Sequence, residues 1–358
     1  MDIQQRKDAF SRLGYFLQNT GNKDSVTFNN KAEEDAYVKL QELTSGLVHY
    51  NGWFDKEHVI HALTALGKSL TSEKLDKWLE KYDTNRLHPG EPNTIGVVMA
   101  GNVPAVGFHD FLTVLVSGNR LLAKLSSDDN KLMPAISDLL VAIEPAFAGR
   151  IEFTDGILKG FSAIIATGSN NTARYFEYYF GKYPNIIRKN RNGVAVLTGE
   201  ETEQELNLLA DDIFLYYGLG CRNVAKLFIP QNYDFDPLLK VLSLKTKVAE
   251  NHKYFNNYEY NKAVFLVNKR DHKDTGNLLL VEDEAFASPV SVVHYEYYEN
   301  LQFLKNKLAV NSEKIQCVVT GGQFVENAVP FGKSQQPELW DYADGVDTMD
   351  FLTGELAG

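Results

Sequence analysis

The segment TIGVVMAGNVP, residues 94–104, decides the fold of this chain. Its apolar part is typical of a buried strand, Gly101 supplies a turn, and Pro104 is placed to open the helix that follows. The same order recurs after it, with strand candidates at 94–99, 121–125, 151–154, 163–167 and 185–189. Because helical spans separate most of these candidates, the pattern predicts βαβ units and a mostly parallel sheet. Such a doubly wound domain binds ligands at the carboxyl ends of its strands.

A second α/β series follows the first. It contains the strand candidate 193–197, the amphipathic helix 202–217, and further strand candidates at 225–229, 263–267, 291–294 and 315–320. The turn Gly218-Leu219-Gly220-Cys221-Arg222 joins that helix to the strand after it. A cysteine in such a turn can expose its sulfur as a nucleophile, or it can be a small buried core residue. Arg222 can lower the pKa of the thiol, or it can form a structural ion pair.

The regions outside the two series carry no chemistry of their own. Apolar residues recur at helical spacing in 32–50 and 59–70, and Asp55 and the segment 71–73 resemble helix N-caps. The stretch from residue 1 to about 83 is therefore predicted to be a helical cover. A turn-rich linker, 87–92, precedes the first strand, and the segment 323–358 is acidic and loop-like.

The composition limits the class of protein. A chain of 358 residues suggests about two domains. Its two cysteines, Cys221 and Cys317, are too few for a disulfide framework and are expected to be free thiols of a reducing compartment. Residues 1–17 lack the apolar core of a secretory signal, and no apolar run approaches the ~18 residues of a membrane span. We therefore expect a cytoplasmic protein with no transmembrane segment, and the net charge of -11 argues against nucleic-acid binding.

Two strand ends of the first series carry polar side chains. Asn102 can point its amide into a crevice, or it can cap the following helix. Lys124 closes an apolar strand beside Ser127, where its amine can hold a ribose or a phosphate, or can simply face solvent. A third strand ends in Thr167-Gly168-Ser169 at the predicted start of a helix, and backbone amides there favour anions such as a pyrophosphate. This turn differs from the Rossmann glycine fingerprint and is weak evidence alone.

The order of these motifs is more specific than any one of them. Strand-Asn-x-Pro, Ser-Gly-Asn-x-x-x-x-Lys, Thr-Gly-Ser and Gly-x-Gly-Cys-Arg in succession resemble the aldehyde dehydrogenase superfamily, and within it the long-chain acyl-CoA reductases of the LuxC type. The resemblance covers residue 94 to the end, including 329–332 and 341–350, and the helical first part matches more loosely. It implies an aldehyde dehydrogenase-like α/β fold in three parts. These are 1–190, the helical N-terminal region and NAD(P)-binding domain; 191–322, the catalytic α/β domain; and 323–358, a tail returning to the first domain.

The resemblance also implies roles for single residues. Cys221 would be the acyl-accepting nucleophile, and Asn102 would be the side-chain donor of the oxyanion hole, together with the backbone amide of Cys221. Lys124 would reach the adenosine ribose of the cofactor.

Further cofactor contacts follow from the same resemblance. Thr167, Gly168 and Ser169 would lie by the pyrophosphate. Glu284 and Phe286 would form the Glu-x-Phe segment that holds the nicotinamide ribose, although one extra residue stands before the proline that follows it.

Two departures from hydrolytic aldehyde dehydrogenases narrow the expected chemistry. Their Glu-Leu-Gly-Gly segment supplies the base that activates water, whereas the corresponding stretch 187–193 has no carboxylate. NAD-preferring relatives commonly have a glutamate three residues after the lysine, where this chain has Ser127. Without that charge a 2′-phosphate is not repelled, so we expect NADPH to be preferred, with NADH possible.

The sequence therefore predicts an oxidoreductase that reduces an acyl-CoA, by resemblance a fatty acyl-CoA, to the aldehyde with NADPH. The alternatives are a nonreductive acyl-binding, acyl-transfer or interaction protein on the same scaffold, and an aldehyde dehydrogenase with another substrate. A homo-oligomer is compatible with the resemblance. The eight histidines show no metal-ligand spacing, so no metal is expected, and His109, His252 and His294 are expected to be ordinary surface or core residues.

Overall fold

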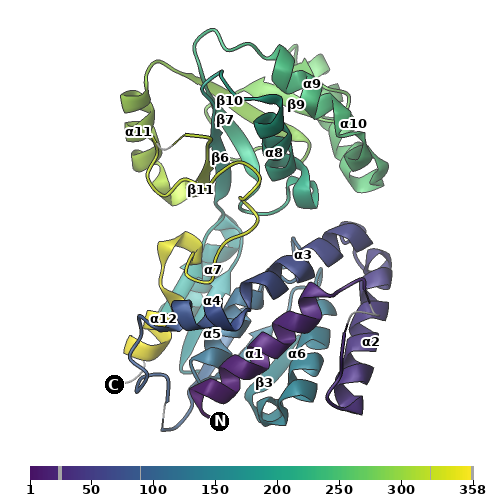
Figure 1. Ribbon diagram of the computed structural model, residues 1–358. Helices are drawn as coiled ribbons and strands as arrows, with labels where there is room; N and C mark the ends of the chain where they lie inside the picture. The colour runs from purple at the N-terminus through teal and green to yellow at the C-terminus, as the bar shows by residue number, and fades with distance from the viewer. Residues whose placement is uncertain (23–25, 89, 323, 356–358) are drawn as a thin grey trace. The chain divides into compact units, whose positions relative to one another are not determined.

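The computed structural model describes residues 1–22, 26–88, 90–322 and 324–355. Within these ranges the chain forms two compact units, which are treated separately below (Figure 1). The first unit contains residues 1–189 and the described residues from 338 onward, and the second unit contains residues 190–337. The second unit thus extends beyond residue 322, and the described residues from 338 onward belong to the first unit.

The first unit opens with four helices: α1 (Ile3–Gln18), α2 (Lys31–Gly46), α3 (Lys56–Ser69) and α4 (Ser72–Leu79). The predicted caps are confirmed at two of them, since the Asp55 side chain accepts from the N–H of His58 and the Thr71 hydroxyl accepts from that of Lys74. Such caps satisfy backbone donors that the first helical turn leaves without a partner. The helices bury large apolar side chains, among them Phe10, Phe16 and Trp78.

A parallel sheet follows, built from β1 (Thr94–Val98), β2 (Arg120–Lys124), β3 (Ile151–Thr154), β4 (Ala163–Thr167) and β5 (Asn185–Arg188). Its strand order is β3-β2-β1-β4-β5, and each of the four pairings is parallel. The chain thus runs outward from β1 through β2 and β3, and then returns to the other side of β1 for β4. The carboxyl ends of β1 and β4 flank a topological switch point, the usual ligand site of an open α/β sheet.

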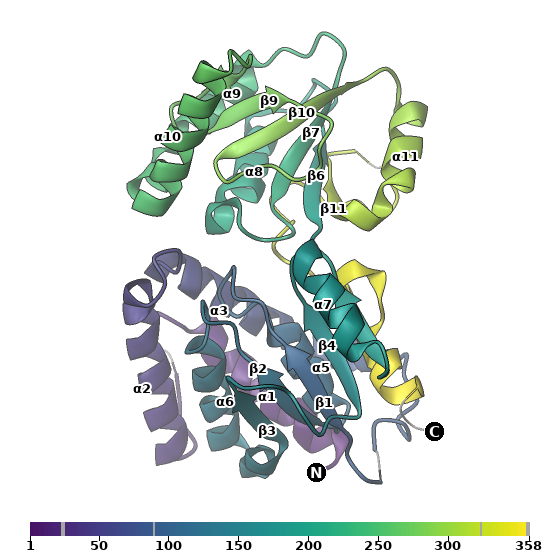
Figure 2. The same ribbon diagram turned by 180° about the vertical axis from the view of Figure 1, so that it is seen from behind.

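Helices cover both faces of this sheet. On one face α5 (Phe108–Val116) and α6 (Leu132–Ile143) pack with α1 and share one large apolar core. On the other face α7 (Asn170–Phe180) covers a smaller cluster that includes Leu122 and Ile164 (Figure 2). The short helix η3 (Pro145–Arg150) leads into β3.

The second unit contains the sheet β11-β6-β7-β10-β9-β8, in which only the short edge pairing of β8 with β9 is antiparallel. Its strands are β6 (Asn192–Val196), β7 (Val224–Pro230), β8 (Lys273–Asp274), β9 (Leu279–Glu282), β10 (Val292–Tyr298) and β11 (Ile315–Val319). Its helical elements are α8 (Glu203–Phe214), η4 (Leu215–Gly218), α9 (Asp236–Leu244), η5 (Thr246–Glu250), α10 (His252–Val267), α11 (Leu301–Val310) and η6 (Ser312–Lys314). Helix α11 lies on one side of the sheet, and α8, α9 and α10 lie on the other (Figure 1).

The strand predicted at 263–267 is wrong, because these residues form the last turn and a half of α10. The buried positions of α10 are Tyr254, Tyr258, Asn261 and Phe265, whose spacing of three and four is that of a helix face. The sheet position is occupied instead by β9, which the sequence analysis did not single out. A short apolar run does not by itself distinguish a strand from a helix end.

The tail of the first unit contains η7 (Ala343–Gly345), α12 (Thr348–Asp350) and the π-helical turn η8 (Phe351–Glu355). Tyr342 anchors it, because its hydroxyl accepts a hydrogen bond of 2.7 Å from the indole N–H of Trp78 and lies 2.6 Å from the hydroxyl of Tyr82. Across the described ranges, no helix combines the length and the apolar character that crossing a membrane requires.

Candidate functional site

The first unit gathers its predicted site residues at one edge of its sheet. Strands β2, β1 and β4 are parallel neighbours, so the loops that leave their carboxyl ends meet at the same edge. Asn102 is exposed in the loop after β1, Lys124 is the partly exposed last residue of β2, and Thr167 is the last residue of β4. The exposed Ser127 follows β2 in the next loop.

Asn102 does not cap a helix. Helix α5 begins at Phe108, later than the proline-initiated start that the sequence predicted, and its N-cap is Gly107. The intervening loop is held instead by Asp129, whose side chain is buried. Its carboxylate accepts hydrogen bonds of 3.0 Å from the N–H of Ala105 and 3.3 Å from the N–H of Leu132. Asp129 thereby fixes the loop of Asn102 to the start of α6.

The loops after β1 and β2 also touch directly. A Cβ atom added at Gly101 would lie 2.6 Å from Oγ of Ser126, so only glycine allows this approach. Asn102 and Ser127 each stand next to one of these two contacting residues. Burial raises the pKa of the nearby Asp129 carboxyl to about 6, despite the two backbone donors that favour its anion.

The Thr167-Gly168-Ser169 turn begins α7, as the sequence predicted. Ser169 is the N-cap, and its hydroxyl accepts a hydrogen bond of 3.2 Å from the N–H of Thr172. A Cβ atom at Gly168 would lie 2.9 Å from a ring carbon of Phe176, so glycine permits close packing of the helix against the strand. The N-terminus of α7 therefore faces the switch-point edge, where its amides can bind an anion.

The turn before Cys221 has an uncommon backbone. Tyr216 and Tyr217, both buried, have φ angles of 52° and 59°, in the left-handed region that bulky residues rarely adopt. Each costs on the order of 1–3 kcal/mol and persists only where the surroundings hold it. Cys221 lies four residues after Tyr217, and it is partly exposed.

The side chain of Asn223 holds this turn in place. No role for Asn223 was predicted from the sequence. Its side-chain amide donates to the carbonyl oxygens of Asp212 at 3.0 Å and Leu215 at 2.8 Å. Its side-chain oxygen accepts from the N–H of Gly220 at 2.8 Å. The end of α8 and the residue before Cys221 are thus fastened to one buried amide. The available signal was an asparagine at the apolar start of a strand.

Arg222 has a structural contact. Its Nε donates a short hydrogen bond to the carbonyl oxygen of Ser334, rather than forming the ion pair considered from the sequence. The carboxylate of Asp212 holds the same segment by accepting from the N–H groups of Gly332 at 2.6 Å and Ser334 at 3.0 Å. The segment 332–334 is therefore fixed beneath the cysteine turn.

The two cysteines lie in different surroundings. Sγ of Cys317, in β11, is 3.7 Å from the carbonyl oxygen of Arg222, and desolvation raises the pKa of its thiol to about 11. A thiol with that pKa stays protonated near neutral pH and is a poor nucleophile. Cys221 is therefore the better candidate for thiol chemistry.

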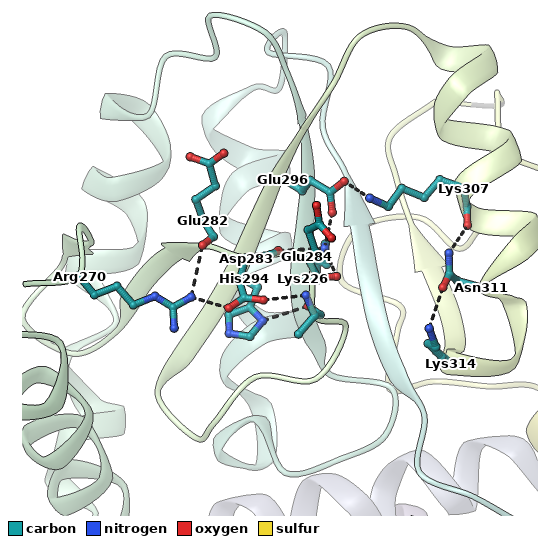
Figure 3. Close-up of polar contacts among 11 residues, drawn as sticks. Lys226, Arg270, Glu282, Asp283, Glu284, His294, Glu296, Lys307, Asn311 and Lys314 are labelled. Atoms are coloured by element: carbon teal, nitrogen blue, oxygen red, sulfur yellow. Dashed lines mark hydrogen bonds and ion pairs between the residues drawn. The ribbon is translucent and has the colours of Figure 1, made fainter. Parts of the chain in front are cut away.

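Glu284 and Phe286 lie in the loop between β9 and β10, while Cys221 precedes β7, so these predicted residues belong to separate loops of the second unit. The side chain of Glu284 is exposed. The ring of Phe286 is instead buried, in an apolar cluster with Phe228 and Leu304. Figure 3 shows Lys226 of β7 and His294 of β10 close to the loop that carries Asp283 and Glu284.

The polar groups at this edge of the first unit are of a kind that can bind a nucleotide. A partly exposed lysine and an exposed serine at the end of β2, together with the helix N-terminus after β4, can bind ribose and phosphate groups of a dinucleotide. Among the residues that the structure describes, no three His, Cys, Asp or Glu side chains are placed to hold a metal ion.

No protein-family model and no curated protein sequence matches the chain. Solved structures do match it. Aldehyde dehydrogenase 21 from Physcomitrella patens, solved with the product succinate, has a TM-score of 0.65 at 11% identity, covering 99% of this chain and 84% of that one. Indole-3-acetaldehyde dehydrogenase from P. syringae, solved as a mutant with NAD+ and IAA, has a TM-score of 0.62 at 15% identity, with 92% and 74% covered.

A third similar structure is the Thermus thermophilus 1-pyrroline-5-carboxylate dehydrogenase, with a TM-score of 0.58 at 12% identity, covering 98% of this chain and 82% of that one. Identities this low establish the fold and not the activity. The likeness extends over nearly the whole chain, including the parallel sheets and the helical N-terminal region. The chain therefore has the α/β fold of the aldehyde dehydrogenases.

Proposed function

We propose that this chain is an NADPH-dependent acyl-CoA reductase that converts a fatty acyl-CoA to the aldehyde through an acyl-Cys221 intermediate. The observation that carries the proposal is the Gly-x-Gly-Cys turn on an aldehyde dehydrogenase-like fold, together with the stretch 187–193, which has no carboxylate. A thiol without a neighbouring base for water is suited to exchanging an acyl group with another thiol.

In this proposal the Cys221 thiolate attacks the carbonyl carbon of the acyl thioester, and negative charge develops on the carbonyl oxygen. The Asn102 amide and the backbone N–H of Cys221 donate hydrogen bonds to that oxygen. Loss of one such donor typically lowers kcat by about 100- to 1000-fold. The bond between the carbonyl carbon and the coenzyme A sulfur then breaks, and coenzyme A leaves as its thiolate.

The proposed cofactor contacts are those that the resemblance to the aldehyde dehydrogenases implies. Lys124 and Ser127 would bind the adenosine ribose and its 2′-phosphate, Thr167, Gly168 and Ser169 would bind the pyrophosphate, and Glu284 and Phe286 would hold the nicotinamide ribose. When bound, NADPH supplies the hydride that reduces the acyl-cysteine. The sulfur of Cys221 then leaves the carbon as a thiolate, and the aldehyde is released. Ser127 carries no charge that would repel a 2′-phosphate, which supports NADPH over NADH.

The nucleophile can be tested by incubating the protein with a long-chain acyl-CoA in the absence of cofactor and measuring its intact mass. The wild type and Cys317→Ala are expected to gain one acyl group, and Cys221→Ala is expected to gain none. A persistent acyl adduct on Cys221→Ala would refute the assignment. Adding NADPH to the acylated protein should then release the aldehyde.

An aldehyde dehydrogenase acting on another substrate is the second candidate, because the similar structures include dehydrogenases, one of them solved with NAD+. The two functions differ in their need for a thiol acceptor. An acyl-CoA reductase run in reverse should reduce NADP+ with an aldehyde only when coenzyme A is present. Turnover without coenzyme A would favour the oxidising dehydrogenase. Failure to bind either cofactor would favour a nonreductive acyl carrier or interaction protein.

A further inference from the structure

Two buried polar residues stand side by side in the central strands of the second unit. Lys226 of β7 and His294 of β10 are register partners across a parallel pairing, so their side chains project from the same face of the sheet. Lys226 has no exposed surface, and His294 is 5% exposed. Neither residue received a role from the sequence, and the chemistry proposed for Cys221 does not use them.

Both side chains hold the backbone of one loop. Nζ of Lys226 donates to the carbonyl oxygens of Asp283 at 3.0 Å and Glu284 at 2.8 Å. Nδ1 of His294 lies 3.0 Å from the carbonyl oxygen of Ala285, and this contact requires the tautomer that donates from Nδ1. Three successive carbonyl groups are therefore held from one face of the sheet (Figure 3).

The loop is also fastened through its first side chain. The carboxylate of Asp283 accepts from Nη2 of Arg270 at 2.5 Å and from the N–H of Ala285 at 2.8 Å. The backbone N–H of Asp283 donates to the carbonyl oxygen of Tyr295 in β10 at 3.1 Å. The segment 283–285 thus has its position set on both sides of Glu284.

All three N–H groups of the Lys226 ammonium donate hydrogen bonds. Its third hydrogen bond, of 2.5 Å, goes to the carboxylate of Glu296, which also pairs with Lys307 of α11. The ammonium group lies 5.1 Å from the ring centroid of Phe286, the residue that follows this segment. A fully buried lysine is uncommon, because taking its charge out of water costs free energy that an apolar side chain would not cost. Lys226 is therefore a candidate for a residue that fixes the position of the loop 283–285.

These hydrogen bonds fix the backbone of Glu284 and leave its side-chain carboxylate exposed to solvent. Glu284 is exposed, and within the described part of the chain its carboxylate takes part in no hydrogen bond or ion pair, so it is available to a ligand. We infer that Lys226 and His294 are positioning residues that hold Glu284 for the nicotinamide ribose of the cofactor. The inference rests on the proposed cofactor role of Glu284, and it assigns neither residue a contact with the reacting atoms.

The inference makes a prediction that a purely structural role does not make. If Lys226 acts through Glu284, its replacement should weaken NADPH binding only while Glu284 is present. A double-mutant cycle measures this dependence directly. Its members are wild type, Lys226→Met, Glu284→Gln and the double variant, each titrated with NADPH through the fluorescence of the cofactor. Lys314→Met is the matched control, because Lys314 also lies near the Phe286 ring, at 5.7 Å, but is exposed and binds Asn311 rather than the loop carbonyls.

We expect Lys226→Met to raise the Kd for NADPH by about tenfold or more, and Lys314→Met to leave it within about twofold. In the Glu284→Gln background, Lys226→Met should change the Kd by less than about twofold. The rate of Cys221 acylation without cofactor should be unchanged in Lys314→Met. Equal effects of Lys226→Met in both backgrounds, or an unchanged Kd, would overturn the inference.

His294 supplies a second cycle that remains informative if Lys226→Met fails to fold. His294→Leu removes the donor to Ala285, whereas the amide of His294→Asn can reproduce it, so only the leucine variant should raise the Kd for NADPH. The same titrations separate this inference from the proposed function. Wild-type protein that binds NADPH without reducing acyl-CoA would refute the proposed function. The double-mutant cycle would still test whether Lys226 affects NADPH binding through Glu284. Wild-type protein that binds neither NADPH nor NADH would overturn both.

Discussion

The side-chain oxygen of Asn223 accepts a hydrogen bond of 2.8 Å from the backbone N–H of Gly220, the residue immediately before Cys221. The nitrogen of the same amide donates to carbonyl oxygens at the end of α8. One buried side chain therefore connects the helix, the left-handed pair Tyr216 and Tyr217, and the proposed nucleophile. The position of Cys221 depends on a residue that contacts no substrate in the proposed reaction.

Replacing Asn223 with alanine should loosen this turn. The variant leaves buried carbonyl groups and one N–H group without partners, at a cost of about 1–3 kcal/mol in the free energy of unfolding. The rate of Cys221 alkylation by iodoacetamide should change as well, because the N–H of Gly220, next to Cys221, loses its hydrogen-bond acceptor. Urea unfolding and alkylation kinetics measure the two effects. Asn207→Ala, in the middle of α8, is the control, and an equal loss of stability there would contradict the specific role of Asn223.

The contact between Gly101 and Ser126 gives a second prediction. Gly101→Ala places a methyl group 2.6 Å from Oγ of Ser126, so the loop of Asn102 must move away from the loop of Ser127. We expect the proposed reductase activity to fall by about tenfold or more, because small displacements of positioning groups are costly in catalysis. Removing the obstacle in Gly101→Ala/Ser126→Gly should restore part of that activity. Gly46→Ala, where an added Cβ meets nothing within 4 Å, is the control.

Regular alternation made the sheet of the first unit predictable. Each of its five strands overlaps a segment predicted from the sequence, because buried parallel strands are short apolar runs bounded by turns. The last turns of α10 were mistaken for a strand, since Val264 and Phe265 carry strand-like side chains whose burial depends on a distant strand, β9. No local pattern distinguishes those two outcomes.

The residues of the candidate site likewise fall into those that the sequence suggested and those that only the structure revealed. Asn102, Lys124 and Ser169 could be proposed as site residues from the sequence because each lies at or after the end of an apolar strand, where polar residues reach a ligand edge. Asn223, Asp129 and the Lys226–His294 pair were not identifiable. Their roles are hydrogen bonds to backbone groups, which no residue pattern marks. Asn223 binds groups 3 to 11 residues away, whereas Lys226 binds the carbonyl of Glu284, 58 residues further along the chain. Only the folded chain brings such partners together.

The ion pair of Arg188 and Asp110 gives a third prediction, for stability. Nη1 and Nη2 of Arg188 donate to the two carboxylate oxygens at 2.6 Å and 2.9 Å, and both side chains are buried. Nη2 also lies 3.1 Å from the hydroxyl of Thr348 in the tail. Asp110→Ala leaves a buried guanidinium without its carboxylate and should lower the free energy of unfolding by about 3–5 kcal/mol.

The exposed ion pair of Lys189 and Glu177 is a matched control for the buried pair of Arg188 and Asp110. Lys189 binds Glu177 at 2.9 Å, but these side chains are 56% and 50% exposed. Solvent screening makes such pairs worth about 0–1 kcal/mol, so Glu177→Ala should leave the unfolding midpoint nearly unchanged. Limited proteolysis should in addition release the tail of Asp110→Ala before that of Glu177→Ala. Comparable destabilisation of the two variants would contradict the buried pair's role.

The buried carboxyl of Asp129 gives a prediction about pH. Its pKa is raised from the ordinary 3.8 to about 6 by desolvation, so between these values the folded state binds a proton that the unfolded state has released. The free energy of unfolding must therefore fall as pH rises through this window, and the full cost is present above pH 6. At ~1.4 kcal/mol for each tenfold change in the ionisation constant, the cost of this group reaches about 3 kcal/mol.

Asp129→Asn removes the ionisation but keeps an acceptor for only one of the two backbone N–H groups. At pH 4.5 the variant should be less stable than the wild type, because a buried hydrogen bond is lost. The difference should shrink as the pH rises to 7.5, since only the wild type then carries a buried charge. Urea unfolding at several pH values measures it, with Asp128→Asn as the control for removing a negative charge from the same turn. A difference between wild type and Asp129→Asn that stays constant with pH would contradict the raised pKa of this carboxyl.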